Sequence, residues 1–291
     1  MGFRTIVVKN RCKLEYSLNF LIVRNQEGEQ RIHIGEIESL IIQSTQVSIT
    51  SALLSNLAEN NINVIICDTK ANPSAELIQF NGIYDSRDKL VNQFNIGNEI
   101  KDLCWQSIIT QKIANQYKVH KRYSTHEEIN KLIEDYLNNI QIGDTTNREG
   151  HTAKIYFNSL FGKEFSRDLD CDVNTYLNYG YTIILSCFNR ALRSIGYYPE
   201  LGIHHIGKTN PFNLSCDLME PIRPLIDSMV LSGKLNQDNF KRELTNVLNE
   251  QVEYDGNKMY LENAIKLYCK SVMSCMISKK VNDIKFIKYD I

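Results

Sequence analysis

The sequence has no cysteine pair spaced C-x-x-C, no apolar run long enough for a membrane span, and almost no net charge. Its eight cysteines are scattered along 291 residues, which excludes a zinc ribbon. A transmembrane helix needs about 20 apolar residues in a row. The formal net charge of −1 excludes a protein that covers nucleic acid with its whole surface, but it permits a local basic face.

Two further absences limit the class of protein. The first residues do not resemble a secretory signal, because Arg4, Lys9, Arg11 and Lys13 interrupt them before an apolar run is long enough. No glycine-rich loop of the kind that cradles phosphates is present, which disfavours an enzyme acting on small phosphoesters. Most cysteines lie in apolar runs, where a free thiol behaves as a small hydrophobe. We therefore expect a cytoplasmic protein with reduced thiols and no membrane contact.

The pattern of the chain predicts an α+β fold with two domains. Residues 3–68 contain short β-branched and alternating runs typical of strands, with one amphipathic helix at 48–60. A chain of this length also exceeds what one hydrophobic core usually supports. We predict a small β-rich domain at 1–70, a turn-rich linker at 71–88 and an all-helical domain at 89–291.

Helical periodicity dominates the second part. Trp105, Ile109, Ile113 and Tyr117 recur every four residues, as on one face of a helix. Thr125 with Glu128, and Thr146 with Glu149, form capping-box patterns. Residues 179–195 are apolar on most sides and predict a central helix. Further helices are expected at 240–252 and 259–278, and a strand-like tail at 285–291 could add to a partner's sheet or remain free.

One stretch, from Gly202 to Val230, combines chemically active residues. His204 and His205 lie in a glycine-containing run, and Asp217 with Glu220 follows in what we expect to be the first turn of a helix. Side chains three residues apart share a helix face, so both carboxylates can face one point. An imidazole opposite them would complete a site of oxygen and nitrogen ligands for a divalent metal.

Each residue taken singly also has a structural explanation. Glu149 can be the capping partner of Thr146, and acids in a helix's first turn gain about 0.3–1 kcal/mol from the helix dipole. Loop histidines are commonly satisfied by local hydrogen bonds. The prolines that follow Glu220 cost little only if Pro221 falls in a first helical turn, which would bring the acids to a helix N-terminus.

Four motifs together resemble a known family. They are Asn-Arg-Glu-Gly-His at 147–151, Tyr-Phe-Asn at 156–158, Gly-Ile-His-His at 202–205 and Asp-Leu-Met-Glu-Pro-Ile-Arg-Pro at 217–224. The chain is similar in these motifs, and in its two-part organisation, to the CRISPR-associated integrase of the Cas-one endonuclease family. The chain length and the sequences of these motifs are closest to those of members from systems that use Cas-nine, the II-A branch.

The resemblance implies a function and a site. In that family a glutamate, a histidine and an acid bind a divalent metal, and they correspond here to Glu149, His205 and Glu220, with Asp217 and His204 as auxiliary candidates. The implied reaction inserts a short DNA duplex, the new spacer, into a CRISPR array by attack of a 3′-hydroxyl on a phosphodiester. Such in-line chemistry uses a cation, and carboxylates with one imidazole suit Mg²⁺ or Mn²⁺.

Partners and DNA contacts are implied as well. The family forms homodimers through its β-rich domains, two dimers flank a Cas-two dimer, and the II-A branch also involves Cas-nine and Csn-two. Double-stranded DNA would be held by local positive charge, for which the candidates are Arg148, Lys208, Lys121, Arg122, Arg190 and Arg193. The alternative is a DNA-binding scaffold of the same assembly that has lost its catalytic metal.

Overall fold

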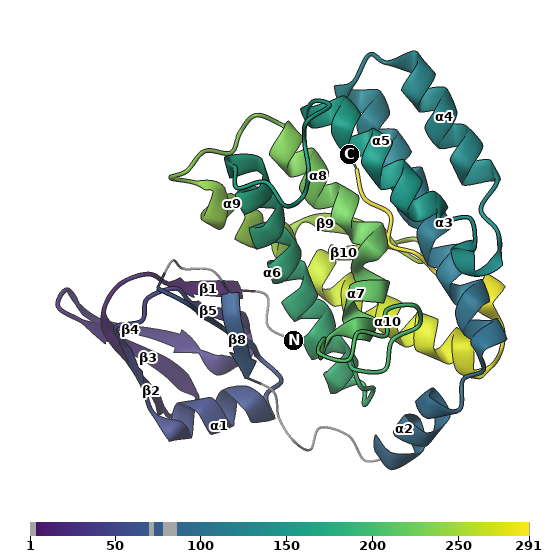
Figure 1. The fold of residues 1–291 in the computed structure, drawn as a ribbon. Coiled ribbons are helices and arrows are strands. Elements are labelled where there is room, and N and C mark those ends of the chain that lie inside the picture. Colours follow the sequence, from purple (N-terminus) through teal and green to yellow (C-terminus); the bar gives the residue numbers. More distant parts are fainter. Residues whose placement is uncertain (1–3, 70–72, 78–85, 291) are drawn as a thin grey trace. The chain divides into compact units, whose positions relative to one another are not determined.

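The computed structural model describes residues 4–69, 73–77 and 86–290. It contains two compact units, Met1–Tyr84 and Asp85–Ile291, and their division falls within the segment predicted as a linker. The β-rich first part and the mostly helical second part agree with the predicted α+β class (Figure 1).

Within the first unit, the described residues form two four-stranded sheets and one α-helix, α1 (Ser51–Glu59). In one sheet the order is β1-β5-β7-β8, with β8 antiparallel to β7 and the other pairs parallel. In the other sheet the order is β4-β3-β2-β6, with only the β2–β6 pair parallel. The strands are β1 (Arg4–Val8), β2 (Cys12–Ser17), β3 (Phe20–Asn25), β4 (Gly28–His33), β5 (Ile37–Ile42), β6 (Val47–Ile49), β7 (Asn63–Cys67) and β8 (Pro73–Leu77).

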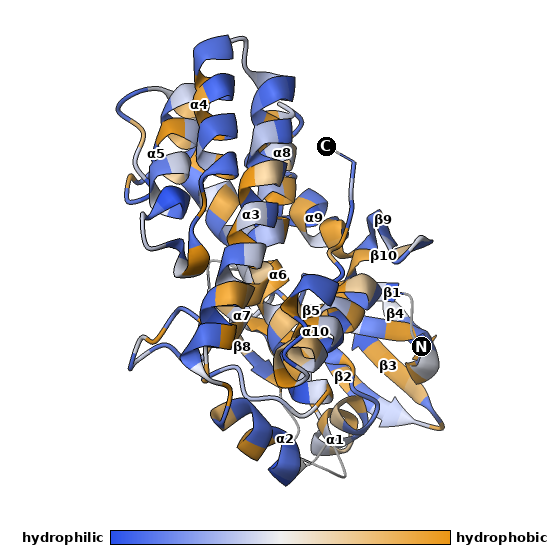
Figure 2. Ribbon diagram, turned by 90° about the vertical axis from the view of Figure 1, so that its right-hand side faces the viewer, coloured by the Kyte–Doolittle hydropathy of each residue, from blue (hydrophilic) through white to orange (hydrophobic). Residues whose placement is uncertain are grey.

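The core of this unit is formed by apolar residues of the predicted strands and of the predicted helix. Leu14, Leu21, Leu40, Leu53 and Val64 are fully buried in one cluster, and Figure 2 shows β3 as a largely hydrophobic strand. The second and third strands, β2 and β3, form an antiparallel pair.

The turn between β2 and β3 follows from the backbone conformation of its two central residues. Leu18 and Asn19 have positive φ angles of 48° and 67°, as the two central residues of a type I′ hairpin turn require.

The linker prediction needs a correction, because β8 lies inside residues 71–88 and pairs with β7. Pro73 is compatible with a strand there because it is the first residue of an edge strand.

The second unit is built of helices around α6 (Asp172–Ser194), which is buried along most of its length and contacts α7 to α10. Gly180 permits the approach of α8, because a Cβ at this position would lie 2.7 Å from Ile226 Cγ2. The longest helix is α3 (Asn98–Tyr123), and α4 alternates between hydrophilic and hydrophobic bands in Figure 2. The other helices are α2 (Ser86–Phe94), α4 (Glu127–Asn138), α5 (Arg148–Phe161), α7 (Asn213–Met219), α8 (Arg223–Leu231), α9 (Phe240–Thr245) and α10 (Leu261–Ile277).

The prediction of an all-helical domain at 89–291 is wrong, because this unit also contains a β-hairpin. The helix predicted at 240–252 ends at Thr245, continues as a 3-10 turn to Asn249, and is followed by a hairpin of β9 (Gln251–Tyr254) and β10 (Asn257–Tyr260). Asp255 and Gly256 have positive φ angles of 51° and 77°. An Asp-Gly pair between strand-like residues is a hairpin signal, and it was overlooked.

Two negative findings concern the described residues. None of the helices in residues 4–69, 73–77 and 86–290 is both long and apolar enough to span a membrane. The eight cysteines are free thiols, most of them buried.

Candidate active site

The His204–His205 loop is organised by one buried carboxylate. Asp217, fully buried in α7, accepts backbone N–H groups from Ile203 at 2.6 Å and from His204 and His205 at 3.1 Å each. Its Oδ1 also lies 2.6 Å from His205 Nδ1. Asp217 therefore holds the loop rather than offering free oxygens to a metal, and it lies in the middle of α7, not in the predicted first turn.

The hydrogen bond to Asp217 also sets the chemistry of His205. When Nδ1–H donates to the carboxylate, the neutral ring keeps Nε2 as the acceptor, which is the usual arrangement of a metal-binding histidine. The hydrogen bond to Asp217 raises the pKa of His205 above its ordinary value, and partial burial only partly offsets this.

His204 has a packing role. Its ring stacks on the indole of Trp105, with ring centroids 4.2 Å apart and an interplanar angle of 1°, and lies perpendicular to the ring of His205. The glycine before the loop is needed for its shape, because a Cβ at Gly202 would lie 2.1 Å from the backbone oxygen of His205.

Glu149 lies at the start of α5 but does not cap it. Asn147 is the N-cap residue and accepts the N–H of Gly150, while the Asp144 carboxylate accepts the N–H groups of Arg148 and Glu149. The capping role proposed for Glu149 with Thr146 is therefore wrong. The predicted Thr125 cap is wrong too, because α4 begins after His126. The Glu149 side chain instead forms an ion pair with Lys112 of α3.

Glu220 meets the same lysine from another direction. It begins a 3-10 turn, η3 (Glu220–Ile222), between α7 and α8, and its side chain is buried. One oxygen lies 2.5 Å from Lys112 Nζ and the other 2.9 Å from Arg223 Nε. Pro221 falls at the start of this turn, as predicted, and Pro224 at the start of α8.

Lys112 therefore stands between two acids from separate elements. It is 6% exposed. Burial alone would lower its pKa, but the carboxylates of Glu220 and Glu149 outweigh burial and the pKa is raised. Burial alone would likewise raise the pKa of Glu220, yet Arg223 and Lys112 outweigh it and the pKa is lowered. Both groups are thus charged at neutral pH.

A pocket of about 240 Å³ opens beside this cluster. It is lined by Lys112, Gln116, Glu149, Ala153, Phe157, Arg167, Tyr181, Glu220, Arg223 and Asp227. Asp227, one of these residues, accepts hydrogen bonds from the hydroxyls of Tyr156 and Tyr181, and burial raises the pKa of its carboxyl to about 6. Arg223 lies over the Tyr181 ring, 4.8 Å from its centroid.

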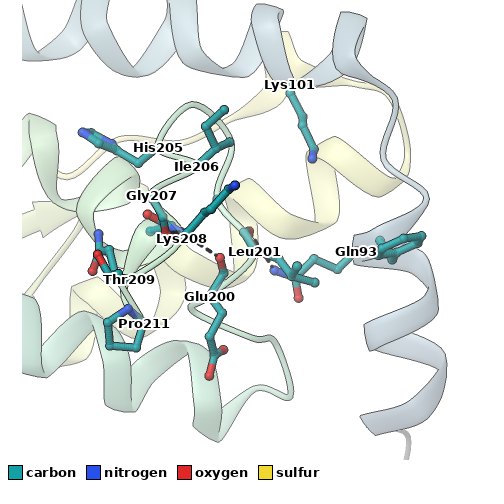
Figure 3. Close-up of a pocket in the computed structure, with 14 residues that line it drawn as sticks. Gln93, Lys101, Glu200, Leu201, His205, Ile206, Gly207, Lys208, Thr209 and Pro211 are labelled. Carbon is teal, nitrogen blue, oxygen red and sulfur yellow. Dashed lines mark hydrogen bonds between the residues drawn. The ribbon is translucent and has the colours of Figure 1, made fainter.

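The structure brings Glu149 and Glu220 together, but His205 does not line their pocket. It lines a second pocket of about 550 Å³, formed by the 200–213 loop and by residues of α2 and α3. Figure 3 shows the His205 ring pointing away from Lys101 and Gln93. Across the described ranges, no three side chains of His, Cys, Asp or Glu are grouped closely enough to hold a metal ion. The three-ligand site therefore stays a prediction.

Three residues of this site were missed in the sequence: Lys112, Arg223 and Asp227. Lys112 had a readable signal. It follows Trp105 by seven residues and Ile109 by three, which places it on the buried face of the same helix, and a lysine at such a position needs acidic partners.

The candidate DNA-binding residues differ in their surroundings. Lys208 lines the second pocket, and Lys121 and Arg148 lie over the rings of Tyr117 and Tyr136. Arg122 lies over Tyr123, 5.7 Å from the ring centroid.

Two of these arginines have acidic partners within the chain. Arg190 pairs at 2.6 Å with Glu262, whose side chain is 3% exposed, and Arg193 pairs with Glu200. A buried pair of this kind favours a structural role for Arg190 over the predicted contact with DNA.

Comparison with known proteins identifies the family. The family model described as "CRISPR associated protein Cas1" matches residues 5–264. The chain belongs to the Cas1 family. A CRISPR-associated endonuclease Cas1 from Neisseria meningitidis serogroup C (strain 8013) is 30% identical over 292 aligned residues, which cover 98% of this chain and 96% of that protein.

Solved structures show the same Cas1 fold. A casposase bound to integration product matches with a TM-score of 0.75 at 20% identity, over 95% of this chain and 91% of that chain. A Cas6-RT-Cas1–Cas2 complex matches with a TM-score of 0.77 at 16% identity. That match covers 97% of this chain but only 36% of the longer fused chain.

Proposed function

We propose that this Cas1 protein is a metal-dependent DNA integrase and endonuclease that inserts short DNA duplexes into a CRISPR array by attack of a 3′-hydroxyl on a phosphodiester. The observation that carries the proposal is the meeting of Glu149 and Glu220 on one buried cation, Lys112. Relatives named as Cas1 endonucleases and the likeness to a casposase bound to its integration product support it.

The donor set fits a hard divalent cation. Two carboxylates from α5 and η3 already hold a positive group between them, and oxygen donors are the ligands that Mg²⁺ and Mn²⁺ prefer. We propose Glu149, Glu220 and Nε2 of His205 as the ligands. When bound, such a cation neutralises phosphate charge and lowers the pKa of an attacking hydroxyl.

The chain's own residues supply the rest of the site. The Asp217 carboxylate is placed to accept the Nδ1–H of His205, which in the neutral ring leaves Nε2 to bind a cation, and Arg223 and Lys112 keep Glu220 ionised in a buried position. Arg148 and Lys208 are proposed to bind backbone phosphates near the ligands, since each comes from a segment that contributes one of them. Phosphate contacts of this type predict binding that weakens steeply with salt.

We propose the following partners and cellular setting from the family resemblance. Double-stranded DNA is the substrate, and the β-rich unit forms a homodimer. The likeness to a Cas1–Cas2 complex supports a Cas-two partner. Assignment to the II-A branch, with Cas-nine and Csn-two as further partners, and a cytoplasmic location belong to the same proposal.

The test is strand transfer of a labelled duplex into supercoiled array DNA. Glu149→Ala, His205→Ala and Glu220→Ala should each lower the rate by at least about 100-fold, the scale of losing one group that acts directly on the reaction. Binding of DNA should remain. Glu134→Ala, an exposed acid on α4, is the matched control. Normal rates in all three variants would end the proposal.

A second candidate, a non-catalytic DNA-binding scaffold, is favoured by one observation. Lys112 fills the position between the two acids, and His205 lies outside their pocket. A chelator separates the two functions. Loss of joining with an unchanged melting temperature supports the enzyme, whereas joining that never occurs at any Mn²⁺ concentration, with DNA binding intact, supports the scaffold.

A further inference from the structure

The segment Lys285–Tyr289, whose role the sequence left open, is docked on its own unit. Ile287 is 2% exposed. Lys288 exchanges two backbone hydrogen bonds with Glu253 of β9, at 2.8 and 2.9 Å, so the segment adds to the β9–β10 hairpin. Lys285 Nζ lies 2.6 Å from Asp255 at the turn of that hairpin. Figure 1 shows this yellow end of the chain running back from α10 past β9.

Beyond this anchor, Tyr289 reaches the turn that contains Glu220. Its hydroxyl donates to the backbone oxygen of Pro221 at 2.7 Å. Burial raises the pKa of Tyr289 well above its ordinary value, so the hydroxyl keeps its proton and remains a donor at neutral pH.

The Pro221 oxygen lacks one donor that a regular 3-10 turn would provide. Pro224, three residues further on, has no N–H to donate to it. A carbonyl oxygen can accept two hydrogen bonds, and here Asn115 Nδ2 provides the second at 2.9 Å. Two side chains from distant parts of the chain thus fix the backbone directly after Glu220, at an oxygen that Pro224 cannot reach with an N–H.

We infer that Tyr289 is a positioning residue for Glu220: through the Pro221 carbonyl it holds η3 so that the Glu220 carboxylate faces Glu149. The inference rests on the proposed function, since it concerns the site where the cation would bind. Tyr289 touches neither acid, and its effect is on the orientation of one of them. Losing it should therefore weaken cation binding more than it affects the reaction at saturating cation.

The test compares two tyrosines of the full chain. Tyr289→Phe removes the bond to Pro221, and the matched control Tyr254→Phe removes a similar bond from a hydroxyl to the backbone oxygen of Leu267. Mn²⁺ binding is measured on the DNA-free protein by electron paramagnetic resonance, together with the Mn²⁺ concentration for half-maximal strand transfer. One hydrogen bond of ordinary strength corresponds to about a fivefold change.

For Tyr289→Phe we expect Mn²⁺ binding about fivefold weaker and a strand-transfer rate that saturating Mn²⁺ restores, while Tyr254→Phe matches the wild type. Asn115 of α3 donates to the same oxygen, so Asn115→Ala should weaken Mn²⁺ binding as well. Agreement between the two variants shows that the effect comes from the lost hydrogen bond and not from another change in one of them. Unchanged Mn²⁺ binding in both Tyr289→Phe and Asn115→Ala overturns the inference alone. Wild-type Mn²⁺ binding that Glu220→Ala leaves intact overturns the proposed site, and the inference with it.

Discussion

Replacing Lys112 by methionine tests the ion cluster most directly. The change keeps most of the side-chain volume but removes the charge that Glu149 and Glu220 share. Breaking a buried ion pair by removing one partner costs about 3–5 kcal/mol, because the remaining charge is left buried. For a unit of this size each kcal/mol lowers the melting temperature by about 2–4 °C. The melting temperature of the helical unit should therefore fall by about 6–20 °C.

The pH dependence of this loss has a definite sign. In the wild type the pKa of Glu220 is lowered, so its stabilising contribution is present above the ordinary pKa of a glutamate and is lost as the pH falls through the lowered value. Without Lys112, Arg223 still lowers the pKa of Glu220 but the contribution of the lysine is gone, so the pKa of Glu220 is higher than in the wild type. The deficit of Lys112→Met should therefore be smaller at pH 5 than at pH 7.5.

Differential scanning calorimetry at both pH values measures this, with Lys118→Met as the control. Lys118 is an exposed lysine of the same helix, where a substitution should change stability by no more than about 0.5 kcal/mol. Mn²⁺ should restore part of the lost stability, since it would supply the missing charge. A melting temperature of Lys112→Met within about 2 °C of the wild type at pH 7.5 would refute the reasoning.

Three further predictions concern other parts of the helical unit. Gly202→Ala should reduce strand transfer with little change in DNA binding, because a Cβ there collides with the His205 backbone oxygen; full activity would contradict the loop geometry. Arg190→Ala should lower the melting temperature by up to about 20 °C, because it removes the charge that pairs with the buried carboxylate of Glu262, and DNA binding measured well below that temperature should be unchanged. Asp227 has a raised pKa of about 6, so its ionisation costs stability as the pH rises through that value. The melting temperature of Asp227→Asn relative to wild type should accordingly rise between pH 4.5 and pH 7.5, and a constant difference would count against this assignment.

Hydrophobic periodicity predicted most of the fold because burial follows it directly. The strand-like runs became β2 to β5, and the four-residue stripe of Trp105 and Ile109 became part of α3. The errors arose where polar contacts decide the structure. Asn147 rather than Thr146 caps α5, because Asp144 reaches forward to take two backbone N–H groups.

The candidate site was predictable in its residues but not in its arrangement. Spacing indicated that Asp217 and Glu220 would face one point, whereas a proline-induced change of helix type turns them to different partners. Lys112 belongs to a segment more than 30 residues from Glu149 and over 100 from Glu220. No local pattern couples such distant residues, and only tertiary packing brings them together.

The four hydrogen-bonding groups that converge on Asp217 have a mechanical consequence. The histidine loop is fastened to α7, and α7 runs without a break into the turn of Glu220. His205 and Glu220 therefore belong to one rigid segment, whereas Glu149 belongs to α5. Because Glu149 and Glu220 already meet at Lys112, the proposed three-ligand centre depends on the His205 side chain turning towards them within this rigid segment.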